Sequence, residues 1–366
     1  MYKEYKKKYC LVFSTRPEII KLYPIIKELK KQKRSFFIIN TGQHFNFEMH
    51  SIFFKELKLK KAKYNFKIYP NISQIKFISK SLIFISDILK KEKPTHVIVQ
   101  GDTNTALIGA LATSIINRDL RNNKRIELVH VESGLRSFDN TMPEEINRKI
   151  IDNLSNILLV PTKFDLKNVK LENLIKNKKV YLTGNTIVDS INQILRAQKN
   201  KKKKIYKNKY FLLTLHRPET VDEIKKFKKL LMDMNIVGNK FNCHFIYPIH
   251  PRSKKKLSNS FQKKINNIKI IEPVNYISFL ELLKNCLIVF TDSGGVQEES
   301  YILNKPCITI RENTERQTTT LNNNNIIAGY KLKNILSATK KLINKKIKNK
   351  LLLGKVGVSK RILNKI

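Results

Sequence analysis

Short apolar segments alternate with amphipathic segments along most of the chain, and this alternation constrains the fold more than any other feature. Strands separated by helices are typical of βαβ units and parallel sheets. A first series predicts a helix from about Pro17 to Lys33 and strands at Tyr9–Phe13, Phe36–Asn40, Thr95–Gln100, Glu127–Val131 and Ile157–Val160. A second series predicts strands at Phe211–Leu215, His244–Pro248, Ile268–Ile271, Leu287–Thr291 and Cys307–Ile310.

The two series predict an α/β protein with two Rossmann-like, doubly wound domains facing each other across a cleft. The 366 residues exceed the roughly 250–300 at which one hydrophobic core usually splits. A polar, basic segment at 198–209 separates the series and is the best candidate for a linker. We therefore expect an N-terminal domain at 1–197 with the acids and a C-terminal domain at 210–366. We also allow for the last helix packing back on the first domain.

The charge balance is strongly basic, with 72 Lys+Arg against 29 Asp+Glu and a formal net charge of +43. Such a chain invites a nucleic-acid interpretation. However, 59 of the cations are lysines and only 13 are arginines, whereas nucleic-acid binders favour arginine and stacking aromatics. Lysine, asparagine and isoleucine are all supplied by AT-rich codons. We therefore favour compositional drift on solvated faces and expect no nucleic-acid partner, with a binding patch as the alternative.

The four cysteines show no paired spacing, which argues against a zinc site or disulfides and fits a reducing cytosol. No stretch approaches the roughly 18 apolar residues of a membrane span. Neither a GxGxxG motif nor a Walker A motif is present, so neither NAD nor ATP is indicated. We expect a cytoplasmic protein without membrane insertion, metal or cofactor.

Cationic side chains follow the first predicted strand, where a helix begins. Arg16 precedes Pro17, which suits the first turn of a helix, and Lys21 lies one turn further on. A helix N-terminus with two cations favours an anion site, although a capped helix with surface charges has the same sequence. After the next strand, Gly42 and then His44 form a short candidate ligand loop.

Three acids lie at or near strand ends in the first half. Asp102 follows one predicted strand after a single glycine, Glu132 directly follows another, and Glu145 lies in the next helical segment. A helix N-cap or a salt-bridge network explains one or two such acids, but three favour general acid–base catalysis. Glu145 and Arg148 are three residues apart, so they share a helical face and can pair. Arg136 and Arg148 are candidate substrate contacts.

In the second half, His216 and Arg217 follow the first strand, and we expect a phosphate contact there. His250 repeats this pattern after the next strand. Another strand leads into a small-residue turn and a helix, with Ser293, Gly294 and Gly295 at its start. Such a turn lets backbone N–H groups approach an anion, and a following acid can accept from ribose hydroxyls. A tight structural turn is the alternative.

The order of these motifs resembles that of the non-hydrolysing UDP-N-acetylglucosamine 2-epimerases. The matching segments are TRPEIIKL (15–22), TGQH (41–44), GDT (101–103), HVESGLR (130–136), PEEINR (143–148), LTGNTIVD (182–189), TLHR (214–217), IHP (249–251), TDSGGVQEE (291–299) and TERQ (314–317).

The resemblance implies a GT-B-like pair of domains and no metal or nicotinamide. It also implies inversion of C2 by elimination of UDP, through 2-acetamidoglucal, and re-addition of UDP to give UDP-N-acetylmannosamine for cell-surface polysaccharide synthesis. The expected assembly is a homodimer. The implied catalytic residues are Asp102, Glu132, Glu145 and His216. The candidate substrate and UDP contacts are Arg16, Lys21, His44, Arg136, Arg148, Arg217, His250, Phe279, Ser293, Gly294, Gly295, Glu299 and Arg316.

Several positions depart from the usual family pattern. Ser14 replaces the opening glycine, and Gln317 replaces the proline of TERP. The segment after TGQH also differs, which puts a regulatory UDP-sugar site in doubt. Relatives acting on other UDP-acetamido sugars tend to carry SGT where this chain has Ser293-Gly294-Gly295, so the resemblance favours UDP-N-acetylglucosamine. The alternatives are a GT-B glycosyltransferase or a 2-epimerase for a related UDP-acetamido sugar.

Overall fold

The computed structural model describes residues 7–42, 57, 59, 61–66, 72–119, 125–197, 206, 208–321, 323–345, 347 and 351–366. The chain divides into two compact units. The first comprises Met1–Gln193 with Leu353–Ile366, and the second comprises Ile194–Leu352. Most of the predicted linker at 198–209 lies outside the described residues. None of the described helices is long and apolar enough to cross a bilayer.

The first unit contains a parallel sheet in the order β3-β2-β1-β4-β5-β6-β7. Its described strands are β1 (Lys8–Phe13), β2 (Ser35–Asn40), β3 (Tyr64–Asn65), β4 (His96–Gln100), β5 (Glu127–Val131), β6 (Ile157–Val160) and β7 (Lys179–Leu182). Its helices are α1 (Arg16–Lys31), α3 (Gln74–Glu92), α4 (Asn104–Asp119), α5 (Pro143–Leu154), α6 (Lys163–Leu171), α15 (Val358–Leu363) and the start of α7 (Ile187–Ala197).

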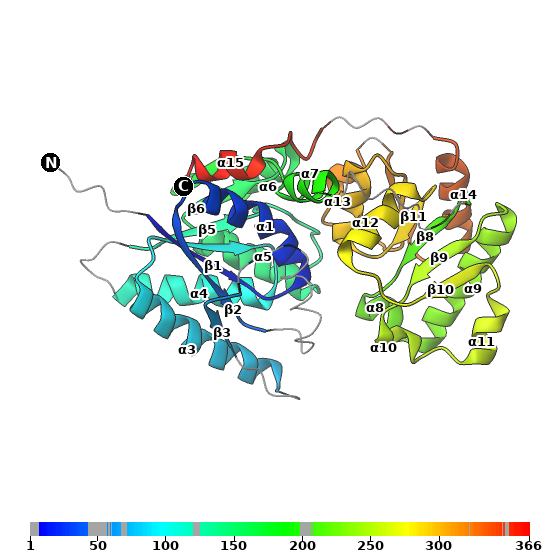
Figure 1. Ribbon diagram of the computed structural model, residues 1–366, viewed down its shortest axis with the longest axis horizontal. Helices are drawn as coiled ribbons and strands as arrows, with labels where there is room; N and C mark the ends of the chain where they lie inside the picture. Colours follow the sequence, from blue (N-terminus) through cyan, green and yellow to red (C-terminus); the bar gives the residue numbers. More distant parts are fainter. Residues whose placement is uncertain are drawn as a thin grey trace. The chain divides into compact units, whose positions relative to one another are not determined.

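Both faces of this sheet are covered, which explains why its strands are apolar throughout rather than alternating. Cys10 and Val12 of β1 belong to a hydrophobic cluster with residues of α3 and α4. Leu11 and Phe13 point to the opposite face and are also fully buried. Figure 1 shows α3 and α4 on one side of the strands, with α1 and α15 on the other.

The second unit repeats this topology with a parallel sheet in the order β10-β9-β8-β11-β12-β13. Its described strands are β8 (Phe211–Thr214), β9 (Phe245–Pro248), β10 (Ile268–Ile271), β11 (Val289–Thr291), β12 (Cys307–Thr309) and β13 (Asn325–Ile327). Its helices are α8 (Pro218–Val221), α9 (Ile224–Lys240), α10 (Pro251–Lys254), α11 (Asn259–Lys264), α12 (Tyr276–Asn285), α13 (Gly294–Ile302), α14 (Leu332–Leu342) and the 3₁₀ turn η1 (Gln317–Thr319).

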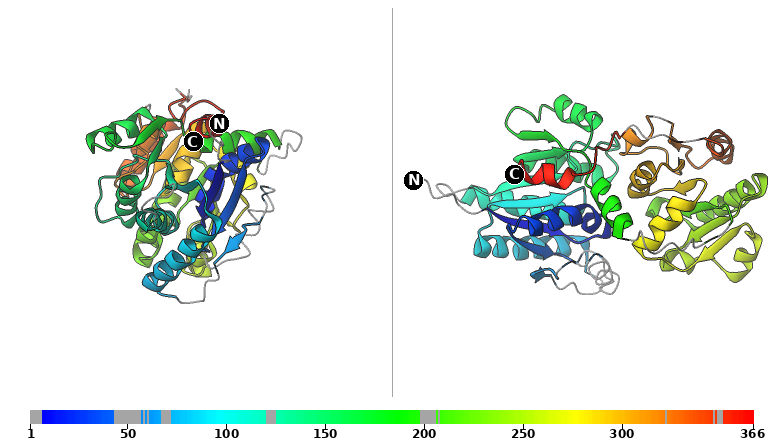
Figure 2. Two further views of the ribbon diagram at one scale, coloured as in Figure 1. Left: turned by 90° about the vertical axis from the view of Figure 1, so that its left-hand side faces the viewer. Right: turned by 45° about the horizontal axis from the view of Figure 1, so that its top comes forward.

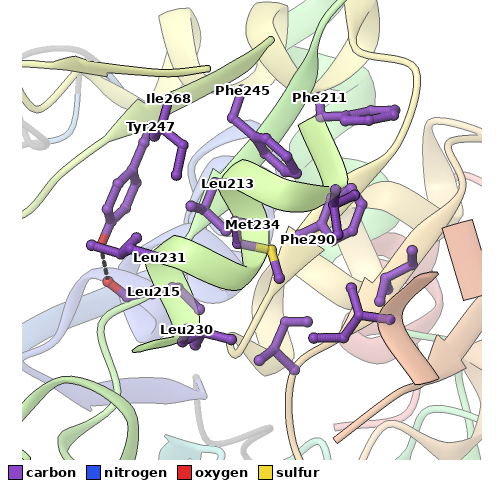
Figure 3. Close-up of a cluster of buried hydrophobic side chains, with 14 of the residues drawn as sticks. Phe211, Leu213, Leu215, Leu230, Leu231, Met234, Phe245, Tyr247, Ile268 and Phe290 are labelled. Carbon is purple, nitrogen blue, oxygen red and sulfur yellow. Dashed lines mark hydrogen bonds between the residues drawn. The ribbon is translucent and has the colours of Figure 1, made fainter. Parts of the chain in front are cut away.

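An aromatic cluster organises the core of the second unit (Figure 3). The rings of Phe211, Phe245 and Phe290 come from three adjacent strands, and their centroids lie 4.9–5.4 Å apart. The Tyr247 hydroxyl donates to the Leu215 carbonyl oxygen at 3.1 Å, so this phenol is buried without losing its hydrogen bond. The cluster thereby fixes the strands that carry the candidate site residues of this unit.

The predicted fold class is confirmed, because both units are doubly wound parallel α/β sheets. All ten predicted strands are present, with ends that differ by at most two residues. The prediction missed β3, β7 and β13, which are only two to four residues long and include half-buried or exposed positions. Such short edge strands lack the continuous apolar run by which buried strands are recognised.

Glu92 at the end of α3 joins three elements of the first unit. Its carboxylate accepts hydrogen bonds from Lys63 at 2.6 Å, from Lys8 at 2.6 Å and from the Tyr64 hydroxyl. These three hydrogen bonds hold the pKa of Glu92 at about 2, below its ordinary 4.5. The pKa is depressed in the folded state, so this stabilisation is present above pH 4.5 and is lost as the pH falls toward 2.

We therefore expect Glu92→Gln to lower stability at pH 7 by about 1–2 kcal/mol, because it removes a shared charged acceptor. The loss should shrink below pH 4, where the wild-type carboxylate also takes up a proton. The measurement is the thermal midpoint by circular dichroism at pH 7 and pH 3. Glu127→Gln is the control, because Glu127 pairs with the exposed Lys179. Equal effects of the two variants at pH 7 would contradict the assignment.

Candidate active site

In both sheets the order reverses beside the first strand, between β1 and β4 and between β8 and β11. Ligands of open α/β sheets bind beyond the carboxyl ends of the strands at such switch points. In the first unit this edge carries Lys21 near the start of α1, Asp102 after β4 and Glu132 after β5. In the second unit it carries His216 after β8 and Ser293 after β11. These five residues therefore lie at the edges where ligands of such sheets bind.

Glu132 lies in the interior at the end of β5 and is 6% exposed. Lys21 donates a short hydrogen bond to its Oε1 and forms an ion pair with it, and Gln100 donates to Oε2. The side-chain amide of Asn185 also donates to Oε1, at 3.4 Å. The backbone at Glu132 has a φ of 75°, which is uncommon for a residue with a side chain. A positive φ at a charged residue is frequent where function fixes the backbone.

Asp102 and Glu145 are joined by Arg148. The Arg148 guanidinium donates to Asp102 Oδ2 at 2.9 and 2.5 Å and to Glu145 Oε2 at 2.7 Å. The side chain of Asp102 is 24% exposed, whereas that of Glu145 is fully buried. The expected pairing of Glu145 with Arg148 on one helical face is therefore present.

Glu145 also anchors the loop before α5. Its carboxylate accepts from the Ser137 N–H at 2.9 Å, from the Ser137 hydroxyl at 3.0 Å and from the Phe138 N–H at 3.1 Å. Burial by itself raises the pKa of Glu145, but the Ser137 hydrogen bonds and the Arg148 charge outweigh it and keep the pKa below its ordinary value. Of these two carboxylates, Asp102 is the one accessible to a ligand.

Glu18 ties the loop after β1 to the loop after β4. Its Oε2 accepts from the Ser14 N–H at 3.1 Å and the Thr15 N–H at 2.7 Å, and its Oε1 accepts from the Thr103 hydroxyl at 2.7 Å. Burial raises the pKa of Glu18, and these hydrogen bonds offset only part of that rise. Because Thr103 follows Asp102, Glu18 connects the start of α1 to the segment that carries this acid.

Arg136, one of the predicted substrate contacts, lies in the interior of the first unit. Its guanidinium is buried, with ion pairs to Asp152 at 2.8 Å and Glu172 at 2.6 Å. Asp152 in turn bonds His130 Nδ1 at 2.7 Å, and His130 Nε2 bonds the Gly101 carbonyl oxygen at 2.9 Å. Arg136 is therefore part of a buried network beneath the strand ends, where two carboxylates compensate its charge.

In the second unit, Asp292 organises the turn after β8. Its buried carboxylate accepts from the His216 N–H at 3.0 Å and the Arg217 N–H at 3.0 Å, and it lies 3.3 Å from His216 Nδ1. The His216 side chain is 53% exposed. Asp292 therefore orients an accessible imidazole at the switch point of this sheet.

The start of α13 is packed against an acidic and a basic side chain. A Cβ atom at Gly294 would lie inside contact distance of Glu315 Oε1 and 3.2 Å from Arg316 Nε, whereas one at Gly295 would be 3.9 Å from its nearest neighbour. Arg316 also pairs with Glu298 at 3.1 Å. Gly294 thus lets the segment carrying Arg316 lie directly on the helix N-terminus, which favours anions.

The other predicted contacts have varied surroundings. Glu299 is buried in α13 and accepts from the Tyr276 hydroxyl at 2.9 Å, and Phe279 lies one turn after Tyr276 and is 8% exposed. Arg16 is exposed as the first residue of α1. His250 is exposed, and its carbonyl oxygen accepts from the first turn of α10. His44 lies outside the described residues.

Three residues that support these sites were not predicted as site residues, namely Gln100, Asn185 and Asp292. Gln100 ends β4 and Asp292 directly follows β11, so their positions at strand ends could have identified them. Asn185 lies within the matching segment LTGNTIVD, but it follows no predicted strand and reaches Glu132 from 53 residues further along the chain.

The environments of Gly294 and Gly295 predict different effects of the same substitution. Gly294→Ala should lower stability by about 1–3 kcal/mol, because the methyl group overlaps Glu315 and displaces the segment with Arg316. Gly295→Ala, in the same helical turn, should leave stability unchanged or raise it by up to about 1 kcal/mol. Thermal unfolding of both variants checks this, and equal midpoints would refute the packing described for Gly294.

The chain is similar to known proteins in sequence and in overall structure. Residues 27–366 match the family model described as UDP-N-acetylglucosamine 2-epimerase. The chain is 48% identical to a UDP-N-acetylglucosamine 2-epimerase of Methanococcus maripaludis, with 91% of each chain covered, and 44% identical to one of Methanocaldococcus jannaschii, with 93% of each covered. It is also similar to the crystal structure of the M. jannaschii UDP-GlcNAc 2-epimerase in complex with UDP-GlcNAc and UDP, with 42% identity, 98% of each chain covered and a TM-score of 0.88. The chain therefore belongs to the UDP-N-acetylglucosamine 2-epimerase family.

Proposed function

We propose that this protein is a non-hydrolysing epimerase that inverts C2 of UDP-N-acetylglucosamine to give UDP-N-acetylmannosamine. The observation that carries the proposal is the pair of ion-paired carboxylates, Asp102 and Glu132, at adjacent strand ends in a chain of this family. The M. jannaschii relative has been crystallised with UDP-GlcNAc and UDP, which supports the same nucleotide sugar here. The product would supply a sugar nucleotide for cell-surface polysaccharide synthesis.

The chemistry requires groups that move protons at C2 and groups that hold the leaving diphosphate. A base removes the C2 proton while the C1–O bond breaks, and the bonding electrons leave with UDP. This gives a C1=C2 double bond, and an acid then returns a proton to the other face of C2 as UDP re-adds at C1. The sequence is redox-neutral. Asp102 and Glu132, on separate strands, are our candidates for the proton transfers.

UDP would bind the second unit in our proposal. The N-terminus of α13, with Ser293, Gly294 and Gly295, offers backbone donors to the diphosphate. Arg316 and Arg217 add positive charge, and His216 assists the departing diphosphate. The remaining candidate contacts are Glu299 for the ribose hydroxyls, Phe279 near the uracil, and Arg16, His44 and His250.

Lys21 and Arg148 have a different role in this proposal from the one their charges first suggest. Lys21 is 3% exposed and bonds Glu132, and Arg148 is 3% exposed and bonds Asp102. Both cations are therefore committed to carboxylates in the structure. We propose that they keep the two acids oriented, rather than meeting the diphosphate.

We also propose that the protein acts in the cytoplasm as a homodimer, the assembly that the family resemblance implies. All four cysteines are buried, unpaired thiols, as is usual in a reducing compartment. Light scattering after size-exclusion chromatography should give twice the 42.8 kDa of one chain. A mass of 42.8 kDa at micromolar concentration would refute the dimer.

Isotope exchange tests the reaction itself. Pure protein incubated with UDP-N-acetylglucosamine in D₂O should yield UDP-N-acetylmannosamine with deuterium at C2, because the returned proton comes from solvent-exchangeable groups. Mass spectrometry and proton NMR follow both events. Transfer of the sugar to an acceptor without C2 exchange would indicate a glycosyltransferase instead. Exchange only with a related UDP-acetamido sugar would correct the substrate.

The three acids should respond differently to amide substitution. Asp102→Asn and Glu132→Gln should each lower kcat by at least about 100-fold, because each removes a proton-transfer group. Glu145→Gln should also lower stability, because Glu145 is the buried acceptor of the loop before α5. Steady-state kinetics and thermal unfolding separate these effects. Unchanged turnover in Asp102→Asn or Glu132→Gln would remove that residue from the acid–base assignment.

A further inference from the structure

The end of the chain returns to the first unit and lies beside the segment that contains Asn185. The chain leaves this unit after Gln193 and re-enters it at Leu353. We call residues 353–366 the C-terminal strap; it includes α15, drawn in red in Figure 2. α15 packs on α1, the helix that carries Lys21. The strap therefore lies against elements that reach the candidate catalytic carboxylate.

Asp189 anchors the strap through three hydrogen bonds. Its Oδ1 accepts from the Gly357 N–H at 2.6 Å, and its Oδ2 accepts from the Ser359 N–H at 2.8 Å and the Ser359 hydroxyl at 2.7 Å. Asp189 is 2% exposed, so these contacts are shielded from water. Arg361 adds a bond from its Nε to the Thr183 carbonyl oxygen at 3.2 Å.

Two glycines allow the strap to lie directly on the segment before α7. Gly184 and Gly354 both have positive φ, at +91° and +98°. A Cβ atom at Gly354 would lie 3.0 Å from the Gly184 Cα, and one at Gly184 would lie 3.2 Å from the Leu353 carbonyl oxygen. Both neighbours are backbone atoms, which cannot rotate away, so side chains at these positions would force the strap outward.

Asn185 connects this contact to Glu132. Its backbone N–H donates to the Leu353 carbonyl oxygen at 2.8 Å. Its side-chain Oδ1 accepts from the Ile187 N–H at 3.1 Å, which fixes the orientation of the amide. The donor end, Nδ2, therefore points to Glu132 Oε1 at 3.4 Å, the oxygen that also binds Lys21. Asn185 is 3% exposed, so its geometry is set by these contacts.

From this geometry we propose that Asn185 is a positioning residue for Glu132, and that the C-terminal strap holds Asn185 in place. The proposal rests on the proposed epimerase function, in which Glu132 exchanges a proton with C2. The strap then contributes to catalysis only indirectly, by positioning Asn185, and none of its residues contacts the reacting atoms. A donor to a carboxylate favours its ionised form, so loss of this donor makes Glu132 hold its proton to higher pH.

The first arm of the test removes the donor. Asn185→Ala should lower kcat by about 10-fold and leave KM within about twofold, because the interaction acts on the reacting group rather than on UDP. The acid limb of the pH–kcat profile should move to higher pH. The carboxyl carbon of Glu132, followed by ¹³C NMR and assigned by its absence in Glu132→Gln, should titrate at higher pH than in the wild type.

The second arm loosens the strap and leaves the Asn185 side chain unchanged. Gly354→Ala should speed hydrogen exchange at residues 353–361 and shift the titration of Glu132 in the same direction. If the Gly354→Ala variant fails to fold, Ser359→Ala is used instead, because it removes one hydrogen bond between the strap and Asp189. The control is Thr113→Ala, which deletes a buried hydroxyl bonded to Gly109 within α4, away from the strap. This control should lower the thermal midpoint without moving the titration of Glu132.

The outcomes separate the inference from the proposed function. A wild-type enzyme that exchanges C2, together with an unchanged Glu132 titration in Asn185→Ala, overturns the inference and leaves the function intact. Faster exchange in the strap with no shift of Glu132 overturns the role of the strap. If the wild type shows no C2 exchange, the proposed function fails, and the NMR titration still decides whether Asn185 and the strap control the protonation of Glu132.

Discussion

The buried ion pair between Lys21 and Glu132 is the interaction on which the first unit depends. Both side chains are only 4% exposed, so each charge has lost most of its hydration. That loss is tolerable only where the partner and further donors are held in place. Gln100 at the end of β4 supplies one donor and Asn185 before α7 supplies another. The parallel order of β1, β4 and β5 brings these donors to one edge of the sheet. The sheet topology is therefore required for the Glu132 carboxylate to be buried with its partners in place.

The second unit has the same sheet topology, but its buried carboxylate at the switch point is held by different donors. Its buried carboxylate, Asp292, is met by the N–H groups of His216 and Arg217. This acid fixes a turn and leaves the imidazole accessible, whereas Glu132 is fixed by other side chains. The start of α13 adds backbone donors, and Gly294 allows Arg316 to lie close to them. Such a site suits a polyanion that is held and released, and the first unit suits groups that exchange protons with a carbon atom.

The sequence predicted the parts of this protein that depend on local pattern. Buried strands are continuous apolar runs, and residues that follow them meet at one edge of a parallel sheet, so Asp102, Glu132 and His216 could be selected. The ion-pair partners of Arg136 could not be predicted, because Asp152 and Glu172 lie up to 36 residues further along the chain, in and directly after helices whose facing sides no local pattern reveals. The contact of Asn185 with Glu132 could not be predicted for the same reason, because it spans 53 residues. Contacts between distant segments determine whether a polar residue faces a ligand or the core.

The net charge of +43 has a different effect from the short-range ion pairs of the candidate sites. Within the candidate sites the cations are matched by acids, as in Lys21 with Glu132 and Arg316 with Glu298. The surplus is therefore carried elsewhere, largely by lysines. Charges separated by more than about 8 Å in water are screened at physiological ionic strength, so exposed lysines influence the approach of an anionic nucleotide sugar more than the bond-breaking step. Compositional drift can accordingly change the surface charge widely, while the ion pair between Lys21 and Glu132 stays buried.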